Sequence, residues 1–251
     1  MNTTNWQSTT FRSSAVGNLL TEPQSKAAKE AGDLSETTKT YLTTRYIEIK
    51  YGRRTEIKSK YLERGKGSEE DSVTMLSQFE GDIFDKNEEQ FSNEWITGTP
   101  DLFRRDENKA ITEVLDIKTC WSLETMLSNL NKPLNTLYEA QMQSYMALTG
   151  ANTAWVCYCL PDFDLGFIEA EKIKLFTQNQ DKYTTELSPQ YLKDCAILER
   201  NYIFNDIPLS EKIIKFKVDR DEDFIQKIYR KVEKSRLYLE NLEEKHLNFN
   251  Q

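Results

Sequence analysis

"ITGTPDLF" (residues 96–103) and "EVLDIKTC" (residues 113–120) carry the clearest structural pattern in the chain. Both read as strands, and the polar turn "DENKA" between them predicts an antiparallel hairpin. Asp101 follows a Gly-Thr-Pro turn, while Asp116 and Lys118 stand two residues apart on the second strand. Side chains at that spacing share one face of a strand. The pattern therefore predicts a hairpin that presents two acids and a lysine together.

The composition limits the class of protein. The chain has 251 residues, of which 38% are hydrophobic and 11% aromatic, enough for one domain with a sizeable core. No apolar run approaches the roughly 20 residues that span a bilayer. The N-terminus lacks the charged segment and apolar stretch of a secretory signal. We therefore expect one domain, residues 1–251, in the cytoplasm.

Cysteine and histidine usage narrows the chemistry. None of the four cysteines forms a C-x-x-C pair, which favours buried thiols in a reducing compartment. They are Cys120, Cys157, Cys159 and Cys195. The single histidine, His246, argues against histidine-based metal binding or acid–base catalysis. Carboxylates and lysine must therefore carry any catalysis.

The net charge of −8 argues mildly against a polyanionic partner, but the charge is unevenly placed. In residues 45–66, eight Lys or Arg stand against three Glu, whereas residues 68–94 contain nine acids and only Lys86. A basic stretch that runs into an acidic one suits a phosphate-binding surface beside a metal site. A solvated charged loop is the alternative.

The remaining elements follow from periodicity and caps. Helices are expected from Ser13 or Ser14 to 20 and at 34–52, 68–81, 122–130, 135–150, 188–204 and 222–247. Strands are expected at 88–93, 94–105, 111–120, 153–161, 166–176 and 212–220. This order predicts an α/β fold with one mixed sheet. We divide it into a loose N-terminus (1–11), a catalytic core (12–161), and C-terminal strands with a long helix (162–251).

Glu69 begins one of these helices, which could bring a third carboxylate over Asp101 and Asp116. Three converging carboxylates repel one another unless a hard cation such as Mg²⁺ or Mn²⁺ lies among them. A lysine beside the cation can orient a water or stabilise charge on a phosphate. This arrangement is typical of a phosphodiesterase. An exposed hairpin with charged outer residues is the alternative.

Four motifs in order carry a family resemblance: G-K-x-x-E (65–69), G-x-P-D (98–101), D-x-K (116–118) and Q-x-x-x-Y (141–145). Together they resemble the PD-(D/E)XK nuclease superfamily. Within it the chain is most similar to phage lambda exonuclease and the YqaJ-type viral recombinase nucleases, relatives of the RecB nuclease domain. The similarity covers about residues 11–161. It implies a restriction-endonuclease-like core, with a central mixed β-sheet flanked by helices.

The resemblance also implies a site. It makes metal ligands of Glu69, Asp101, Asp116 and the carbonyl of Ile117, which would bind one or two Mg²⁺ or Mn²⁺ ions. It makes Lys118 the catalytic lysine, with Gln141, Gln143 and Tyr145 lining the site. The expected DNA contacts are Arg12, Ser13, Ser14, Arg53, Arg54 and Lys66. The family often has Glu where this chain has Asp116. The helical ligand could be Glu69 or Glu70, and the Gly-Lys spacing favours Glu69.

The implied function is a Mg²⁺-dependent exonuclease that digests duplex DNA ends, 5′→3′, in phage-type recombination inside a bacterial cell. Relatives of this kind often form homo-oligomeric rings and work with a single-strand annealing protein. An endonuclease of the same fold and a catalytically inactive DNA-binding scaffold are the alternatives. A relative with an iron–sulfur cluster needs three cysteines clustered near the C-terminus, which this sequence lacks.

Overall fold

A four-stranded mixed sheet forms the centre of the protein. The computed structural model describes residues 4–53 and 68–249. The sheet contains β4 (Leu102–Arg105), β5 (Ile111–Thr119), β6 (Thr153–Cys159) and β7 (Ile213–Asp219), in the order β4-β5-β6-β7. β5 and β6 are parallel, and the two outer pairs are antiparallel. The predicted mixed sheet and the β4–β5 hairpin are therefore confirmed.

A second, smaller sheet was not predicted. It joins β1 (Phe11–Arg12), β3 (Ile96–Gly98) and β2 (Phe91–Ser92), in the order β1-β3-β2. The expectation of one sheet, with a continuous strand over 94–105, was wrong. Pro100 has no N–H to donate to a ladder, so the chain leaves one sheet before it and enters the other after it. Asp101 lies at this change of sheet.

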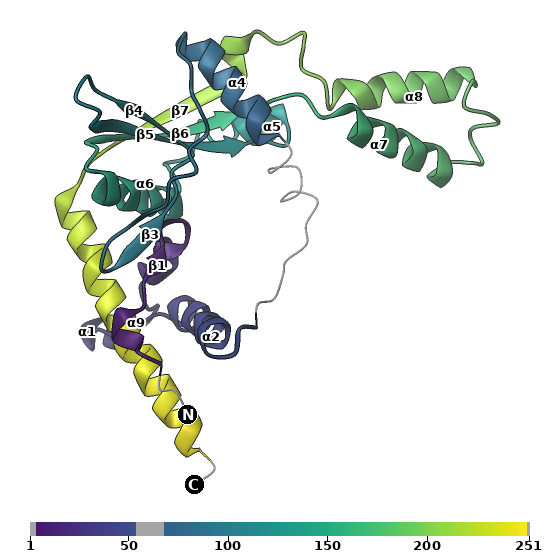
Figure 1. The fold of residues 1–251 in the computed structure, drawn as a ribbon. Helices are drawn as coiled ribbons and strands as arrows, with labels where there is room; N and C mark the ends of the chain where they lie inside the picture. Colours follow the sequence, from purple (N-terminus) through teal and green to yellow (C-terminus); the bar gives the residue numbers. More distant parts are fainter. Residues whose placement is uncertain (1–3, 54–67, 250–251) are drawn as a thin grey trace.

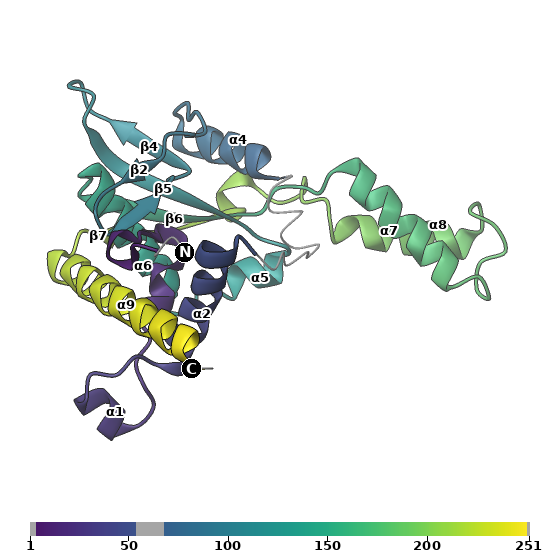
Figure 2. The same cartoon turned by 60° about the horizontal axis from the view of Figure 1, so that its bottom comes forward.

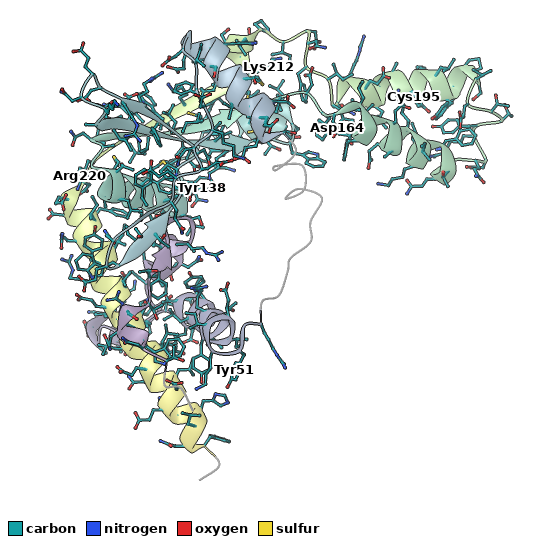
Figure 3. All side chains as sticks on the ribbon, in the orientation of Figure 1. Tyr51, Tyr138, Asp164, Cys195, Lys212 and Arg220 are labelled. Atoms are coloured by element: carbon teal, nitrogen blue, oxygen red, sulfur yellow. The ribbon has the colours of Figure 1, made fainter. Side chains whose placement is uncertain are left out.

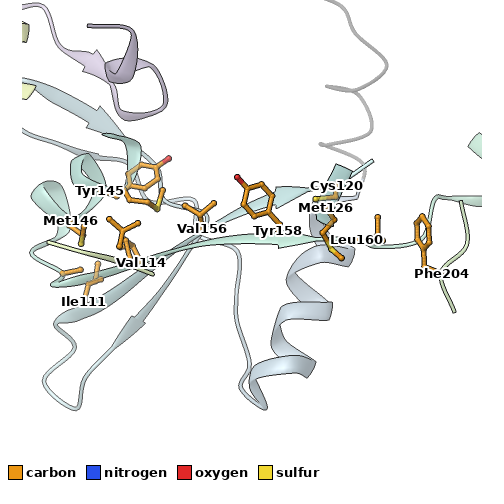
Figure 4. Close-up of a cluster of buried hydrophobic side chains, with 14 of the residues drawn as sticks. Ile111, Val114, Cys120, Met126, Tyr145, Met146, Val156, Tyr158, Leu160 and Phe204 are labelled. Atoms are coloured by element: carbon orange, nitrogen blue, oxygen red, sulfur yellow. The ribbon is translucent and has the colours of Figure 1, made fainter. Parts of the chain in front are cut away.

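Helices cover both faces of the central sheet (Figure 1). The apolar side chains of β5 alternate, so Leu115 packs with α4 (Glu69–Glu80) on one face. Val114 packs with α6 (Thr136–Thr149) on the other. Figure 4 shows the α6 side, where Val114 lies next to Tyr145 and Met146 in one buried cluster. All four cysteines are buried and none forms a disulfide, as expected.

The N-terminal and C-terminal segments form a second core. It joins η1 (Trp6–Ser8), η2 (Ser13–Leu19), α2 (Glu36–Tyr51) and α9 (Glu222–Asn248), while α1 (Lys26–Glu30) buries no side chain. The expected loose N-terminus is wrong for residues 4–11. Trp6 is 2% exposed, stacks on Tyr46 and donates a hydrogen bond to Glu243 at 2.6 Å. The helix predicted near residue 13 is a 3₁₀ helix.

A helical hairpin, α7 (Leu165–Gln178) and α8 (Pro189–Arg200), projects from the body (Figures 1 and 2). The strand expected at 166–176 was therefore wrong. The Asp164 carboxylate caps α7 by accepting from the Phe167 N–H at 2.8 Å, a helix start that the strand reading overlooked. Figure 3 labels Asp164 at the base of this arm and Cys195 along it. The helix predicted at 188–204 is confirmed.

Two short helices complete the description, α5 (Leu123–Leu127) and η3 (Leu209–Glu211). Within residues 4–53 and 68–249, no helix is long and apolar enough to cross a membrane.

An ion-pair network fixes α4 to the sheet. Glu80, at the C-terminal end of α4, pairs with Lys215 of β7 and with Arg104 of β4 at 2.8 Å. Arg104 also pairs with Glu113 of β5 at 2.7 Å. Burial alone would raise the pKa of Glu80, but the hydrogen bonds from Lys215 and Arg104 outweigh it and lower that pKa. Because Glu69 begins the same helix, this network also helps to hold Glu69 in place.

Replacing Glu80 by glutamine is expected to lower the free energy of unfolding at pH 7 by about 1–3 kcal/mol, because it removes the anion of Lys215 and one of the anions of Arg104. The lowered pKa means that the charged pair stabilises the fold at neutral pH and is lost in acid. The difference from wild type should therefore close below about pH 4. Urea unfolding across pH measures it. Glu107→Gln, in an exposed turn, is the control, and an equal loss there would contradict the prediction.

Candidate active site

Residues from all four separated sequence motifs meet in one cleft. Its volume is about 740 Å³, and it lies beside β5 and α6. The predicted residues that line it are Ser14, Glu69, Asp101, Asp116, Ile117, Lys118, Gln141 and Tyr145. They come from η2, α4, the β3–β4 turn, β5 and α6. The cleft therefore joins acids, a lysine and an amide that lie up to 72 residues apart in sequence.

Asp116 and Lys118 form the centre of the site. Asp116 is 1% exposed, and Lys118 is in ion-pair contact with its Oδ2 atom. Gln141 donates from Nε2 to Asp116 Oδ1 at 2.8 Å, and its Oε1 accepts from Lys118 Nζ at 3.4 Å. One amide thus holds both charged groups, as a glutamine can because it has a donor and an acceptor.

Asp101 is tied to the end of β5. Its Oδ2 accepts a hydrogen bond from the Ile117 N–H at 2.7 Å. Burial, and then the nearby charge of Asp116, raise the pKa of Asp101 to about 7. Burial also raises the pKa of Asp116, against the effect of Lys118. The buried carboxylate of Asp116 and the half-buried carboxylate of Asp101 therefore lie near a single ammonium, that of Lys118, an arrangement that favours binding of a further cation.

Glu69 lines the cleft from the start of α4, whereas its neighbour Glu70 is exposed and does not. The geometry thus favours Glu69 as the helical ligand. Its Oε2 atom is 2.8 Å from Lys86 Nζ. Among the residues that the structure describes, no three acidic, histidine or cysteine side chains are already gathered at metal-binding distance. Glu69 faces the same cleft as the two aspartates, but it is engaged by a lysine.

The contacts of Tyr145 and Gly98 show what these two further motif residues do in the structure. The Tyr145 hydroxyl accepts from Gln141 Nε2 at 2.9 Å and donates to the Thr99 carbonyl at 3.2 Å. A Cβ atom on Gly98 would lie 2.5 Å from Ser13 Oγ and 2.7 Å from Tyr145 Cε1. The glycine of G-x-P-D therefore lets the turn before Asp101 pack against α6 and η2.

Replacing Gly98 by alanine is expected to destabilise the protein by about 1–3 kcal/mol, because the added methyl group has no space. The shift should also move Asp101, three residues on, and weaken binding of a divalent ion. Urea unfolding and calorimetry with Mn²⁺ measure the two effects. Adding Ser13→Ala removes one of the clashing atoms and should restore part of the stability. A Gly98→Ala variant as stable as wild type would contradict the packing argument.

Gln143 was expected to line the site, and this expectation was wrong. Its Nε2 donates to the Asp219 carbonyl at 2.8 Å, and its Oε1 accepts from the Asp221 N–H at 2.9 Å. Gln143 is two residues from Gln141, which on a helix corresponds to a rotation of about 200°. It therefore faces away from the cleft and joins α6 to the connection between β7 and α9.

The expected DNA contacts divide into three groups. Ser14 lines the cleft, and the buried Ser13 beside it donates to the Thr97 carbonyl at 3.2 Å. Arg12 pairs with Glu48 at 3.7 Å, outside the cleft, so the structure does not bring it into the site. Arg53 is exposed, also outside the cleft lining. The two remaining predictions, Arg54 and Lys66, lie outside the described residues.

Two cleft neighbours escaped the sequence reasoning. The centre of the Tyr138 ring lies 4.7 Å from Lys118 Nζ, a cation–π contact that helps to hold the ammonium. Figure 3 labels Tyr138 on α6. Because it stands three residues before Gln141, helical spacing could have found it. The second neighbour is Lys86, whose contact with Glu69 no family motif indicated.

Solved structures share this fold. A phage-related exonuclease from Haemophilus somnus 129PT matches with a TM-score of 0.70 at 23% identity, over 95% of this chain and 96% of that chain. An alkaline exonuclease from Laribacter hongkongensis matches with a TM-score of 0.61 at 15% identity, over 97% and 98%. The same enzyme in complex with dAMP gives 0.59 at 16% identity, over 96% and 94%.

Neither a protein-family model nor a curated protein sequence matches the chain. At these identities the structural likeness establishes the fold. The predicted restriction-endonuclease-like core, a central mixed β-sheet flanked by helices, is therefore confirmed.

Proposed function

We propose that this chain is a Mg²⁺-dependent exonuclease that hydrolyses phosphodiester bonds from the ends of duplex DNA, in the 5′→3′ direction, during phage-type recombination. It would act in the cytoplasm of a bacterial cell that carries the phage or prophage. The observation that carries the proposal is the convergence of Asp101, Asp116 and Lys118 in one cleft, on a fold shared with exonucleases. One fold neighbour was solved in complex with dAMP, which supports nucleotide binding by this chain.

The side chains of the cleft fit a hard divalent cation. Glu69, Asp101 and Asp116 offer carboxylate oxygens, and Ile117 offers a backbone carbonyl, which are the ligand types that Mg²⁺ and Mn²⁺ prefer. Apart from the Lys118 ammonium, Asp116 Oδ2 has no hydrogen-bond partner among the described residues, although it is buried. When bound, such a cation would supply a Lewis acid for the phosphate and lower the pKa of an attacking water.

The protein's own residues position the reaction. Lys118 holds a positive charge at the phosphate, where it stabilises the negative charge that develops during attack and orients the water. Gln141 holds Asp116 with its amide N–H and Lys118 with its amide oxygen, beside their direct ion pair. Tyr145 supports that amide and fixes the turn before Asp101. These contacts preorganise the site before substrate arrives.

DNA binding would use the basic stretch and the far wall of the cleft. Asn129, Lys132 and Asn135 line this wall between α5 and α6 and can donate to phosphate oxygens. Contacts of this kind hold the backbone without reading sequence. Binding should therefore weaken as salt rises.

The family resemblance also supports a homo-oligomeric ring and a single-strand annealing protein as partner. Leu165, Ile173 and Leu187 are exposed on the projecting arm, as expected for a contact surface. Size-exclusion chromatography with light scattering tests the ring. A mass several times that of one chain is expected, and a monomer would exclude it.

The test of function uses linear duplex DNA, labelled at one 5′ or one 3′ end, beside closed circular DNA. Each is incubated with the purified protein in Mg²⁺ or in chelator. We expect Mg²⁺-dependent loss of the linear DNA alone, with the 5′ label released first. Cutting of the circle would instead indicate an endonuclease. Binding without cleavage in any divalent metal would indicate a DNA-binding scaffold.

A further inference from the structure

Lys86 brings a positive charge to the acidic site from outside all four motifs. It lies in the segment that follows α4 and leads to β2. Its Nζ atom is 2.8 Å from Glu69 Oε2, and the two side chains are 45% and 27% exposed. Glu69 is the cleft acid that α4 supplies. Asp116 is engaged by Lys118 and Asp101 by a backbone N–H. Lys86 therefore pairs with the third candidate carboxylate ligand, Glu69.

The backbone beside Lys86 is fastened to the turn that carries Asp101. The Asn87 N–H donates to the Asp101 carbonyl at 2.8 Å, and Asn87 Nδ2 donates to the Pro100 carbonyl at 2.8 Å. Asn87 Oδ1 in turn accepts from the Glu89 N–H at 2.8 Å. Lys86 directly precedes Asn87 in the chain, so these bonds hold its backbone beside the Pro100–Asp101 turn. Lys86 is thus linked to the site twice, through the backbone at Asn87 and through its side-chain contact with Glu69.

The arrangement explains why the acids of the cleft are not gathered. Lys118 is bound to Asp116, and Lys86 is bound to Glu69, so each lysine occupies a carboxylate that a metal ion would need. We propose that Lys86 is a tethered cation of this site, which holds Glu69 in the metal-free protein and competes with a divalent ion for that carboxylate. The inference rests on the proposed function, because it presumes that the cleft binds a metal ion.

The competing explanation is an ordinary surface ion pair. Exposed pairs contribute only about 0–1 kcal/mol, and such pairs are common on acidic surfaces. Two observations favour the tethered cation. The Asn87 bonds to Pro100 and Asp101 fix the segment at the site, and Lys86 is the only basic residue in 68–94. An ordinary surface ion pair would not be expected to show either of these two features.

Calorimetry of Mn²⁺ binding to the chelator-treated full-length protein tests the proposal. Lys86→Gln removes the competing charge and should tighten Mn²⁺ binding about two- to fivefold, the factor that corresponds to an exposed ion pair. Lys39→Gln is the matched control, because Lys39 is also exposed and lies 2.8 Å from an acid, Glu36, on α2. Its Mn²⁺ affinity should equal that of wild type.

A double variant separates competition at Glu69 from a general charge effect. In a Glu69→Gln background, Lys86→Gln should leave the Mn²⁺ affinity unchanged, because the contested carboxylate is gone. The same gain in that background, or equal or weaker binding by Lys86→Gln alone, would overturn the tethered-cation proposal. Failure of the wild-type protein to bind Mn²⁺ at all would instead overturn the proposed metal-dependent function.

Discussion

Replacing Lys118 by alanine is expected to reduce DNA cleavage by about 10²- to 10³-fold, the loss typical of removing one group that stabilises transition-state charge. Lys118 contacts Asp116 and Gln141 and lies over the Tyr138 ring, so its ammonium is held at one place in the cleft. The carboxylates of Asp101 and Asp116 remain in the variant. Mn²⁺ and DNA binding should therefore be largely kept. Single-turnover nucleotide release, calorimetry and fluorescence anisotropy measure the three quantities.

Lys118→Met keeps most of the side-chain volume beside Tyr138, so it separates loss of charge from loss of packing. It should be as inactive as the alanine variant. Lys39→Ala, which removes a lysine from exposed α2 surface, should cleave like wild type. Full activity in either Lys118 variant would contradict the assigned role. Loss of Mn²⁺ binding along with cleavage would show that the lysine organises the acids rather than acts on the phosphate.

The part of the site that sequence could predict is the part set by local periodicity. The two-residue spacing of Asp116 and Lys118 places both on one face of β5, as the structure shows. The four-residue spacing of Gln141 and Tyr145 places both on one face of α6, where they share a hydrogen bond. The same reasoning, applied to Gln143, would have excluded it, because a two-residue step turns a helix by about 200°.

The errors in the fold arose where distant residues decide the local structure. Residues 4–11 look polar and loose, but Trp6 is held by Tyr46 and Glu243, which follow it by 40 and 237 residues. The amphipathic residues 166–176 fit a strand or a helix about equally by pattern. The cap at Asp164 and packing against α8 settle them as helix. The packing is tertiary information that the sequence pattern lacks, whereas the Asp164 cap is a local signal that the strand reading overlooked.

The sequence contains part of the information needed to identify Lys86 as a site residue. It is the only basic residue among the nine acids of residues 68–94, which made it conspicuous. Its partner could not be inferred, because the contact with Glu69 depends on how the segment after α4 folds back onto the Asp101 turn. The charge pattern indicates only that this lysine has acidic residues near it. The path of the backbone determines which of these acids it contacts.

Replacing Asp101 by asparagine is expected to stabilise the metal-free protein and to abolish its stabilisation by Mn²⁺. An amide can still accept from the Ile117 N–H, while the repulsion between the carboxylates of Asp101 and Asp116 is removed. The pKa of Asp101 is raised from its ordinary value of 3.8 to about 7. Ionising this group in the folded protein therefore costs free energy, fully above about pH 7 and not at all below about pH 4.

The expected signature is thus a melting temperature higher than wild type by a few degrees at pH 8, with the difference vanishing near pH 4. Adding Mn²⁺ should raise the melting temperature of wild type but not of Asp101→Asn, because stabilisation by a ligand requires that the folded state bind it. Asp181→Asn, the same exchange on the exposed arm, should respond to Mn²⁺ like wild type. If Asp101→Asn were instead less stable than wild type at pH 8 without metal, Asp101 would be a structural anion. The two carboxylates would then not be held together for a cation, and the central premise of the metal site would fail.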